Sequence, residues 1–567
     1  MDRGLDRRGP EVAIKTPYSI ILAALPLLFL GAFFFYPLAS ILLQGLMQDG
    51  HWDLSGPARL FSHRAYAGVI WFTTWQAALS TVLTLIIALP AAYVFARYRF
   101  AGRNLLLSLT AIPFVLPSVV VASAFQALLG SRGLVNAWLM DSFSLTRAPI
   151  ALDHTIWFIL MAHVFYNFTV IVRIVGSSWA RLQPEISQAA RMLGATPLRC
   201  FREVTLPLIM PSVLAASMLV FIFCFSSFGV ILLLGGPRFS TIEVEIYRQA
   251  VHLFNLPMAS ALSLLQILLT LAFMGTYTAL QRRTTVTLYP ESRAVTERRV
   301  STPRDMLIVG ATCLFVLMLL GSPLAALLAR SFQGPGGLTL DYYRNLSVNI
   351  GQSLFFIPPL KAMGYSLGFA LSTLVMALAV GLPAAFTLSR ASGPLGAVLD
   401  PILMLPLACS AVTLGFGFII ALDEPPLNLR TSVWLIPLAH TLVAYPFVVR
   451  SVLPSLKGIP NALKEAASML GASPAMVFLK VVAPIVSRAV VVGAIFAFTI
   501  SIGEFGATVF IARPDTPTMP LAIYRFLGQP GDLNYGQAMA MSSILMLVTA
   551  AGFLLLDRVR LDRGGGY

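Results

Sequence analysis

Long apolar stretches constrain this chain more than any other feature. Twelve of them approach the roughly 20 residues that an α-helix needs to cross a bilayer. Only 11% of the residues are charged, whereas soluble domains carry about a quarter. Backbone donors cannot stay unpaired in lipid, so each stretch is predicted to be a helix. The predicted spans are 19–43, 70–95, 105–129, 154–176, 206–234, 258–280, 306–329, 364–388, 396–422, 431–452, 486–511 and 537–556.

Basic residues are unevenly distributed between the loops. The net charge of +15 would suggest nucleic acid for a soluble protein, but in a membrane protein Lys and Arg gather on cytoplasmic loops. With both termini cytoplasmic, 27 of the 39 Lys and Arg residues fall on the cytoplasmic side. The first apolar run is too long for a signal-peptide core. We therefore expect a retained first helix, two cytoplasmic termini, membrane lipid as a partner and no nucleic acid.

The two halves of the chain repeat each other. From about residue 160 the register is constant at an offset of 277, as in Ala162-His163 with Ala439-His440, and Phe228-Gly229 with Phe505-Gly506. Six helices in each half make both copies run the same way through the membrane, which predicts a parallel pseudo-dimer with a path between the halves. The predicted units are a first repeat at 1–280, a cytoplasmic linker at 281–304 and a second repeat at 305–567.

A short amphipathic segment lies between the fourth and fifth predicted helix of each half. A small apolar helix, a Gly that permits a left-handed turn and a Pro that opens the next membrane helix follow one another in both copies. An exposed apolar helix on the cytoplasmic side is predicted to dock a partner. The loops span 184–207 and 461–484, and their candidate docking residues are Gln188, Ala189, Ala190, Gly194 and Pro207 with Glu465, Ala466, Ala467, Gly471 and Pro484.

This pattern resembles the signature loop of ABC-importer permeases: Glu-Ala-Ala, three residues, Gly, nine residues, apolar, any, Leu, Pro. The chain departs from it at Gln188, where the family has Glu, and at Ala483, where it has Leu. The resemblance implies the type I ABC importer permease fold, an all-α integral membrane protein of the bacterial inner membrane. It also implies a coupling helix in each loop, two copies of an ATP-binding subunit and a periplasmic or lipid-anchored substrate-binding protein.

No Gly-Lys dipeptide occurs in the chain, so it lacks the phosphate-binding loop of an ATPase. ATP and Mg are therefore expected on the partner subunit, and this chain is expected to be a transport subunit with no catalytic residue. The four scattered cysteines, Cys200, Cys224, Cys313 and Cys409, predict neither a metal site nor a disulfide framework. No cofactor is expected in this chain.

The stretches Phe225–Gly229, Thr241–Tyr247 and Ser501–Gly506 resemble fused permeases of thiamine importers. Ferric-iron importers share the two-times-six layout and remain an alternative. An alternative of another class is a six-plus-six secondary carrier, which would more typically bear coupling acids deep in several helices. A membrane enzyme would need clustered His, Asp or Glu on one face.

Glu504 and its repeat mate Ser227 are the candidate residues of the substrate path. Glu504 is predicted to lie within the eleventh helix, where a carboxylate costs roughly 3 kcal/mol and should face the bundle or a wet cavity. It could attract a cation, but an interhelix hydrogen bond or helix-end contact is the simpler interpretation. His163 and His440 are interpreted as packing contacts rather than metal ligands.

Overall fold

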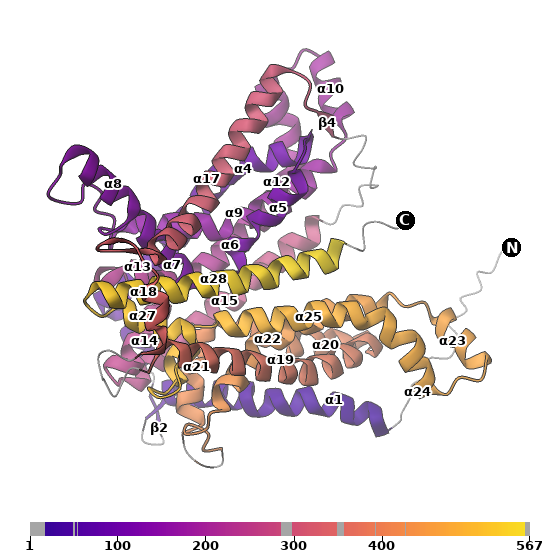
Figure 1. The fold of residues 1–567 in the computed structure, drawn as a ribbon. Coiled ribbons are helices and arrows are strands. Elements are labelled where there is room, and N and C mark those ends of the chain that lie inside the picture. The colour runs from indigo at the N-terminus through magenta and orange to yellow at the C-terminus, as the bar shows by residue number, and fades with distance from the viewer. Residues whose placement is uncertain are drawn as a thin grey trace.

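The computed structural model is helical and describes residues 17–48, 51–53, 55–284, 297–348, 357–391, 393–423, 425 and 427–561 (Figure 1). The helices of the first half are α1 (Pro17–Leu30), α2 (Tyr36–Leu46), α3 (Ser55–Ser62), α4 (Arg64–Arg97), α5 (Arg103–Thr110), α6 (Ile112–Val115), α7 (Ser118–Leu129), α8 (Leu134–Phe143), α9 (Ile156–Ala180), α10 (Pro184–Met192), α11 (Pro197–Cys200), α12 (Leu206–Phe225), α13 (Gly229–Leu234), α14 (Ile242–Tyr247) and α15 (Leu256–Thr284). Those of the second half are α17 (Pro303–Ser331), α18 (Asp341–Arg344), α19 (Pro359–Arg390), α20 (Gly393–Met404), α21 (Ala411–Ala421), α22 (Leu435–Lys457), α23 (Asn461–Met469), α24 (Pro474–Val477), α25 (Ala483–Gly503), α26 (Thr508–Ile511), α27 (Met519–Leu527) and α28 (Asp532–Leu561).

Strands are limited to three short pairs in the described residues. They are the antiparallel pair β1 (Met47–Gln48) and β2 (His51–Trp52), the parallel pair β3 (Tyr98–Arg99) and β4 (Arg298–Arg299), and the antiparallel pair β5 (Gln333–Gly334) and β6 (Gly337–Leu338).

The number of membrane-spanning helices depends on one bend. Within the described ranges, eleven helical segments are long and apolar enough to cross a membrane. The count becomes twelve when Gly393–Ala408 and Ala411–Ala421, which meet at 93°, form one broken span. The predicted continuous helices 105–129 and 396–422 are therefore wrong in detail. In the first half the helix breaks before Pro117, which lacks an N–H and disfavours helical backbone at Leu116.

Two further predicted helices, 206–234 and 486–511, also end early. Helix α12 stops at Phe225 and α25 stops at Gly503, each followed by a non-helical turn and a short helix. At Gly503 a Cβ atom would lie 2.8 Å from Cγ of Pro117, so the two halves approach closely at this break. The apolar composition continues across both breaks, which is why hydropathy alone joins the pieces.

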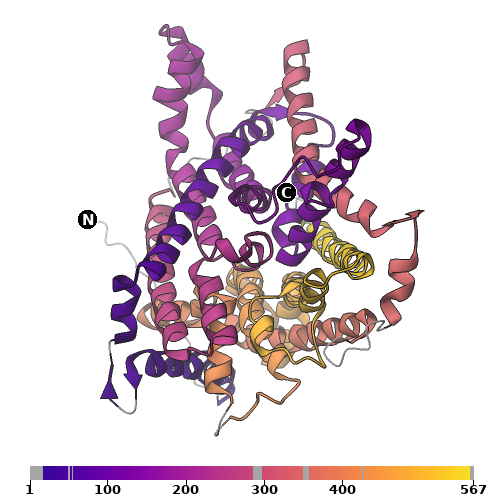
Figure 2. The ribbon, with the colours of Figure 1, turned by 90° about the vertical axis from the view of Figure 1, so that its left-hand side faces the viewer.

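The first helices of the two halves are exchanged. Helix α1 packs against α19 and α2 against α21 of the second half, although α2 also packs against α15 of its own half. Helix α17 packs against α7 and α4 of the first half and also against α28 of its own half. Seen from the end that carries α14 and α27, the remaining helices of each half lie on opposite sides of the molecule (Figure 2). The repeated Leu-Pro-Ala-Ala segments place Ala91, Ala92, Ala384 and Ala385 in the core with no exposed surface. Small side chains of this kind let membrane helices approach closely.

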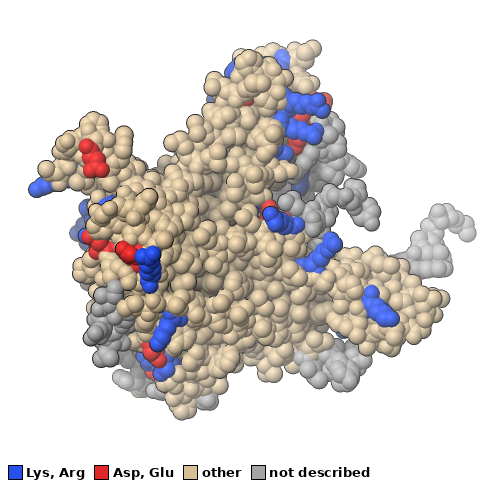
Figure 3. Space-filling view, viewed as in Figure 1, with Lys and Arg blue, Asp and Glu red and all other residues tan. Residues whose placement is uncertain are grey.

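Both docking segments lie at the same end of the molecule. Helices α10, α23 and α24 project from the end at which α1 begins and α28 ends, whereas α14, α18 and α27 lie at the other end (Figure 1). On the face shown in Figure 3, Lys and Arg gather over α10 and β4, and a broad uncharged area follows toward the middle of the molecule. This is the surface pattern of a protein embedded in lipid.

The end of the linker is attached to the first half. Strand β4 pairs with β3, Arg103 forms an ion pair with Glu297 at 2.8 Å, and Arg298 forms one with Asp305 at 3.3 Å. The Tyr98 hydroxyl donates to Oδ1 of Asp305 at 3.1 Å, and burial raises the pKa of this phenol. The remainder of the predicted linker, 285–296, lies outside the described residues.

Candidate functional site

Most residues of helices α10 and α23 are exposed. Neither has a buried residue, although membrane and soluble helices of this length normally depend on packing of one face. Next to their C-terminal ends, Met192 and Leu193 are each 89% exposed, and Met469 and Leu470 are 90% and 89% exposed. The two halves thus expose the same apolar pair at the same point of the repeat.

The end of each exposed helix is closed by the same set of backbone hydrogen bonds. The N–H of Ala195 donates to the carbonyl of Ala190 and the N–H of Ala472 to that of Ala467, both at 3.1 Å. Gly194 and Gly471 have φ of +86° and +82°, the left-handed conformation that this Schellman cap requires. The predicted glycine turns are therefore present in both halves.

The other predicted loop residues lie around this cap. Gln188, Ala189, Glu465 and Ala466 are exposed on α10 and α23, and Ala190 and Ala467 are half-buried. Beyond the glycines, Thr196 and Ser473 cap α11 and α24 by accepting from the N–H of Arg199 and Met476. Pro207 and Pro484 lie in the first turns of α12 and α25. In each loop the glycine cap and the helix that follows it are held by hydrogen bonds, while the apolar pair beside the glycine stays exposed.

A cavity of about 900 Å³ lies behind the first docking loop. The linker strand β4 forms one side of it through Glu297 and Arg298, and α10 contributes Gln188 and Arg191. This cavity lies beside one half and not between the two, so it does not mark a path through the molecule.

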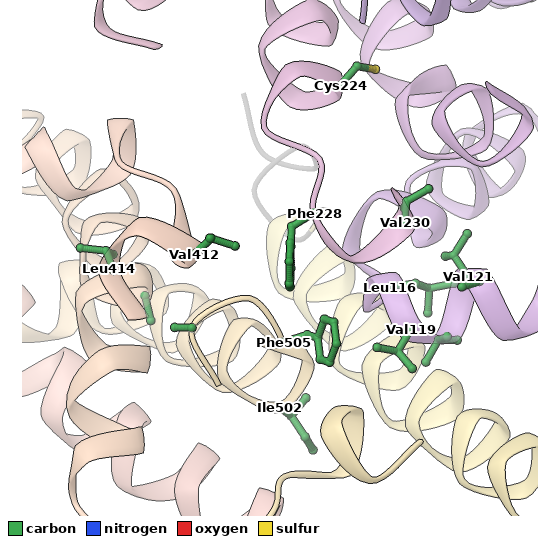
Figure 4. Close-up of a cluster of buried hydrophobic side chains, with 14 of the residues drawn as sticks. Leu116, Val119, Val121, Cys224, Phe228, Val230, Val412, Leu414, Ile502 and Phe505 are labelled. Atoms are coloured by element: carbon green, nitrogen blue, oxygen red, sulfur yellow. The ribbon is translucent and has the colours of Figure 1, made fainter. Parts of the chain in front are cut away.

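A second cavity, of about 500 Å³, lies between the halves. It is lined by both sets of broken helices, including Ser227 and Glu504, so the structure brings the two candidate path residues to one space. Phe228 and Phe505, which are repeat mates, face each other across the halves with ring centroids 5.8 Å apart and planes at 26° (Figure 4). Tyr247 and Tyr524, also repeat mates, pack against Phe228 and Phe505 at 5.7 and 5.5 Å. Tyr247 lies in α14 and Tyr524 in α27, so this aromatic group joins the halves at the end that carries these two helices.

The two repeat-related histidines are each held between hydroxyl groups. Nδ1 and Nε2 of His163 lie 2.9 Å from Oγ of Ser80 and Ser227. Both nitrogens of His440 are likewise 2.8 Å from hydroxyl oxygens, those of Ser501 and Thr508. Each imidazole therefore ties a broken helix to its neighbour.

Glu504 is placed at the end of a helix, and the predicted position inside a continuous helix is wrong. It follows α25 with an extended backbone, and its carboxylate accepts from the N–H of Ala507 at 3.0 Å and of Thr508 at 3.1 Å. The Thr508 hydroxyl donates to it at 2.8 Å, and Nε2 of His440 lies 3.4 Å away. The Glu504 carboxylate thus accepts hydrogen bonds from backbone N–H groups that the break in the helix would otherwise leave unpaired.

Glu243 is a cavity residue that the sequence analysis missed. It lines the central cavity from α14 and is fully buried. Its carboxylate accepts from Nε2 of Gln266 at 3.0 Å and from Oγ of Ser410, in the other half, at 3.1 Å. The available signal was the pair of acidic residues Glu243 and Glu245 in the short stretch Thr241–Tyr247, with Pro520 at the position of the second repeat that matches Glu243.

Both halves of the chain are similar to known transport proteins. The family model described as "Binding-protein-dependent transport system inner membrane component" matches residues 85–286 and 377–560, one match in each half. The chain belongs to this family. The predicted fused permease of an ABC importer, with two six-helix repeats, is confirmed.

Relatives of this permease include proteins named for thiamine. It is 27% identical to the thiamine transport system permease protein of Brucella abortus over 502 residues, which covers 87% of both chains. The corresponding protein of Escherichia coli is 26% identical over 87% of this chain and 88% of its own. A putative 2-aminoethylphosphonate transport system permease of Salmonella paratyphi A is 25% identical over 47% of this chain and 92% of its own. A solved chain of a bacterial ABC transporter for the polysaccharide alginate has a TM-score of 0.39 at 18% identity, covering 47% of this chain and 96% of that chain.

Proposed function

We propose that this permease forms the translocation path of an ATP-driven thiamine importer. Two copies of a separate ATP-binding subunit dock on the loops 184–207 and 461–484, and a periplasmic or lipid-anchored binding protein delivers substrate at the opposite end. The observation that carries the proposal is the pair of exposed, identically capped helices α10 and α23 at one end of the molecule. Two equivalent docking points suit two copies of one motor subunit.

The docking end faces the cytoplasm in this proposal. The helix ends and loops assigned to that side carry 27 of the 39 Lys and Arg residues, as expected for cytoplasmic segments. The beginning of α1, the end of α28 and the described part of the linker lie at that end as well. Both termini are therefore assigned to the cytoplasm.

ATP drives transport by changing the distance between the docking loops. Closure of the ATPase dimer draws α10 and α23 together and reorients the two halves about the central cavity. Nucleotide can shift such an equilibrium only through different affinities for its two states. The loops must transmit that difference, and their rigid caps at Gly194 and Gly471 suit this role.

Thiamine is favoured as substrate by the relatives. Those named for thiamine share the fused layout, since they match 87% of the chain over both halves, whereas the relative named for 2-aminoethylphosphonate is a shorter chain that matches 47% of this one with 92% of its own length. Ferric iron stays the competing substrate to test, because fused permeases of that class share the layout. Binding of thiamine and of ferric iron to the partner binding protein separates the two.

Reconstitution tests the proposal directly. Proteoliposomes with the permease, its ATPase and its binding protein should accumulate radiolabelled thiamine only when ATP is enclosed with the ATPase. The permease alone, given an ion gradient, should move no thiamine. Concentrative uptake by the permease alone would make it a secondary carrier.

A further inference from the structure

Glu243 is a buried carboxylate without a cationic partner. It has no exposed surface, and within the described ranges no Lys, Arg or His nitrogen lies within 4.0 Å of its oxygens. Its two donors, Gln266 and Ser410, are neutral. Burying a carboxylate in this way is costly, and an intramembrane carboxylate without a paired charge points to a functional role.

Two neighbouring carboxylates show how Glu243 differs. Glu504 is satisfied by the turn that follows it and by His440, all within the second half. Glu245 is also fully buried, but it is paired with Arg248 at 2.9 Å and with Gln249 at 2.7 Å, within the first half. Only Glu243, of these three, accepts a hydrogen bond that crosses from one half to the other.

The crossing contacts share one location. The hydrogen bond from Ser410 to Glu243 and the stacked pair Phe228 and Phe505 both join the halves at the central cavity. If the halves separate at this end, both contacts break together. Separation then uncovers one carboxylate and the faces of two aromatic rings in the same space.

Aromatic faces attract organic cations, and a carboxylate lining the same cavity adds an opposite charge. We propose that Glu243, Phe228 and Phe505 form a site for an organic cation when the path is open toward the binding protein. The inference rests on the proposed function, under which the ligand is the thiazolium ring of thiamine. In this structure the Ser410 hydroxyl donates to the Glu243 carboxylate and the two rings stack on each other, so the proposed site becomes available to a ligand only after the halves separate.

Direct binding to a trapped complex tests the site. The permease is assembled in nanodiscs with an ATPase that binds but cannot hydrolyse ATP, and retention of radiolabelled thiamine by the tagged permease is measured at increasing thiamine concentration. The wild type should bind saturably. Glu243→Gln should bind about tenfold more weakly or worse, as expected for loss of a charged partner.

Two matched variants separate the site from general damage. Glu245→Gln removes an equally buried carboxylate two residues away. Ser410→Ala removes the crossing hydrogen bond, together with the cap that accepts from the N–H of Thr413, but keeps the Glu243 side chain. Both should bind thiamine within about threefold of the wild type, since neither removes a partner of the cation. Wild-type binding by Glu243→Gln, or equal losses in Glu243→Gln and Glu245→Gln, would overturn the inference.

Uptake in proteoliposomes distinguishes a failure of the cation site from a failure of the proposed thiamine import. If the wild-type complex imports thiamine with ATP but the trapped complex does not bind it, the site is wrong and the proposed function stands. If the wild-type complex imports no thiamine, the proposed function is wrong, and the assignment of thiamine to this site is wrong with it.

Discussion

Glu504 illustrates how one residue accommodates a break in a membrane helix. Helix α25 ends at Gly503, and the side chain of Glu504 then accepts from two backbone N–H groups at the start of α26. Its repeat mate Ser227 has a different partner, since it contacts Nε2 of His163. Both breaks therefore involve a histidine and a hydroxyl group, and the second half adds the Glu504 carboxylate.

We predict that Glu504→Ala lowers the stability of the permease. The variant loses an acceptor for buried N–H groups, which costs about 1–2 kcal/mol for a helix cap. The apparent melting temperature of the purified protein should fall, and Ser226→Ala, which removes only a hydroxyl bonded to its own helix, should change it less. Unchanged melting together with lost thiamine uptake would instead indicate that Glu504 contacts the substrate.

At the scale of the element, the turn of each proposed docking loop depends on one glycine. Gly194 and Gly471 adopt positive φ, but a Cβ atom at either position would meet no atom within 4 Å. A side chain there is unfavourable because of the backbone conformation and not because of crowding. Substitution should therefore alter the turn and leave the membrane bundle intact.

We predict that Gly194→Val or Gly471→Val uncouples transport. Each should reduce thiamine uptake and co-purification of the ATPase about tenfold, while the amount of permease in the membrane is unchanged, because about 1–2 kcal/mol of strain falls on the docking turn. Gly275→Val is the control, since Gly275 lies on a helix surface with open space around it. Normal uptake and normal ATPase assembly in both loop variants would contradict the coupling role.

The whole molecule is organised by its pseudo-twofold axis. The first membrane helix of each half packs against helices of the other half, and the repeat-related rings of Phe228 and Phe505 stack between the halves. Opening the path at that end requires these rings to separate. The pair is therefore a position at which the motion of the whole molecule can be stopped.

We predict that a cross-link between Phe228→Cys and Phe505→Cys stops transport. Oxidation or a short bifunctional maleimide should abolish ATP-dependent thiamine uptake in a background without the four native cysteines, and for the disulfide, reduction should restore it. Each single variant should respond little to the same reagent. Continued uptake after complete cross-linking, measured on the same sample, would show that the path does not open between these residues.

Topology is the second prediction at this scale. A single cysteine at Ser142, in α8, should react with an impermeant maleimide in intact cells, whereas one at Arg304, at the start of α17, should react only after permeabilisation. Both positions are exposed, so access depends on the side of the membrane. The test follows from the excess of basic residues on the side that holds Arg304. Labelling of Arg304→Cys in intact cells would reverse the assigned orientation.

The sequence by itself determined the membrane class, the two halves and the capped docking loops. These properties are local or repeated, because apolar length decides insertion, and a glycine followed by a helix-opening proline decides a turn wherever they occur. Apolar composition does not show where a helix is interrupted. The spans 206–234 and 486–511 were therefore predicted as continuous helices, although α12 ends at Phe225 and α25 at Gly503. The contact between Glu243 and Ser410 joins residues 167 positions apart. Only the tertiary structure decided that contact. It also decided the packing of each first helix against the other half and the pairing of β3 with β4. Each of these features depends on how segments far apart in the sequence pack together.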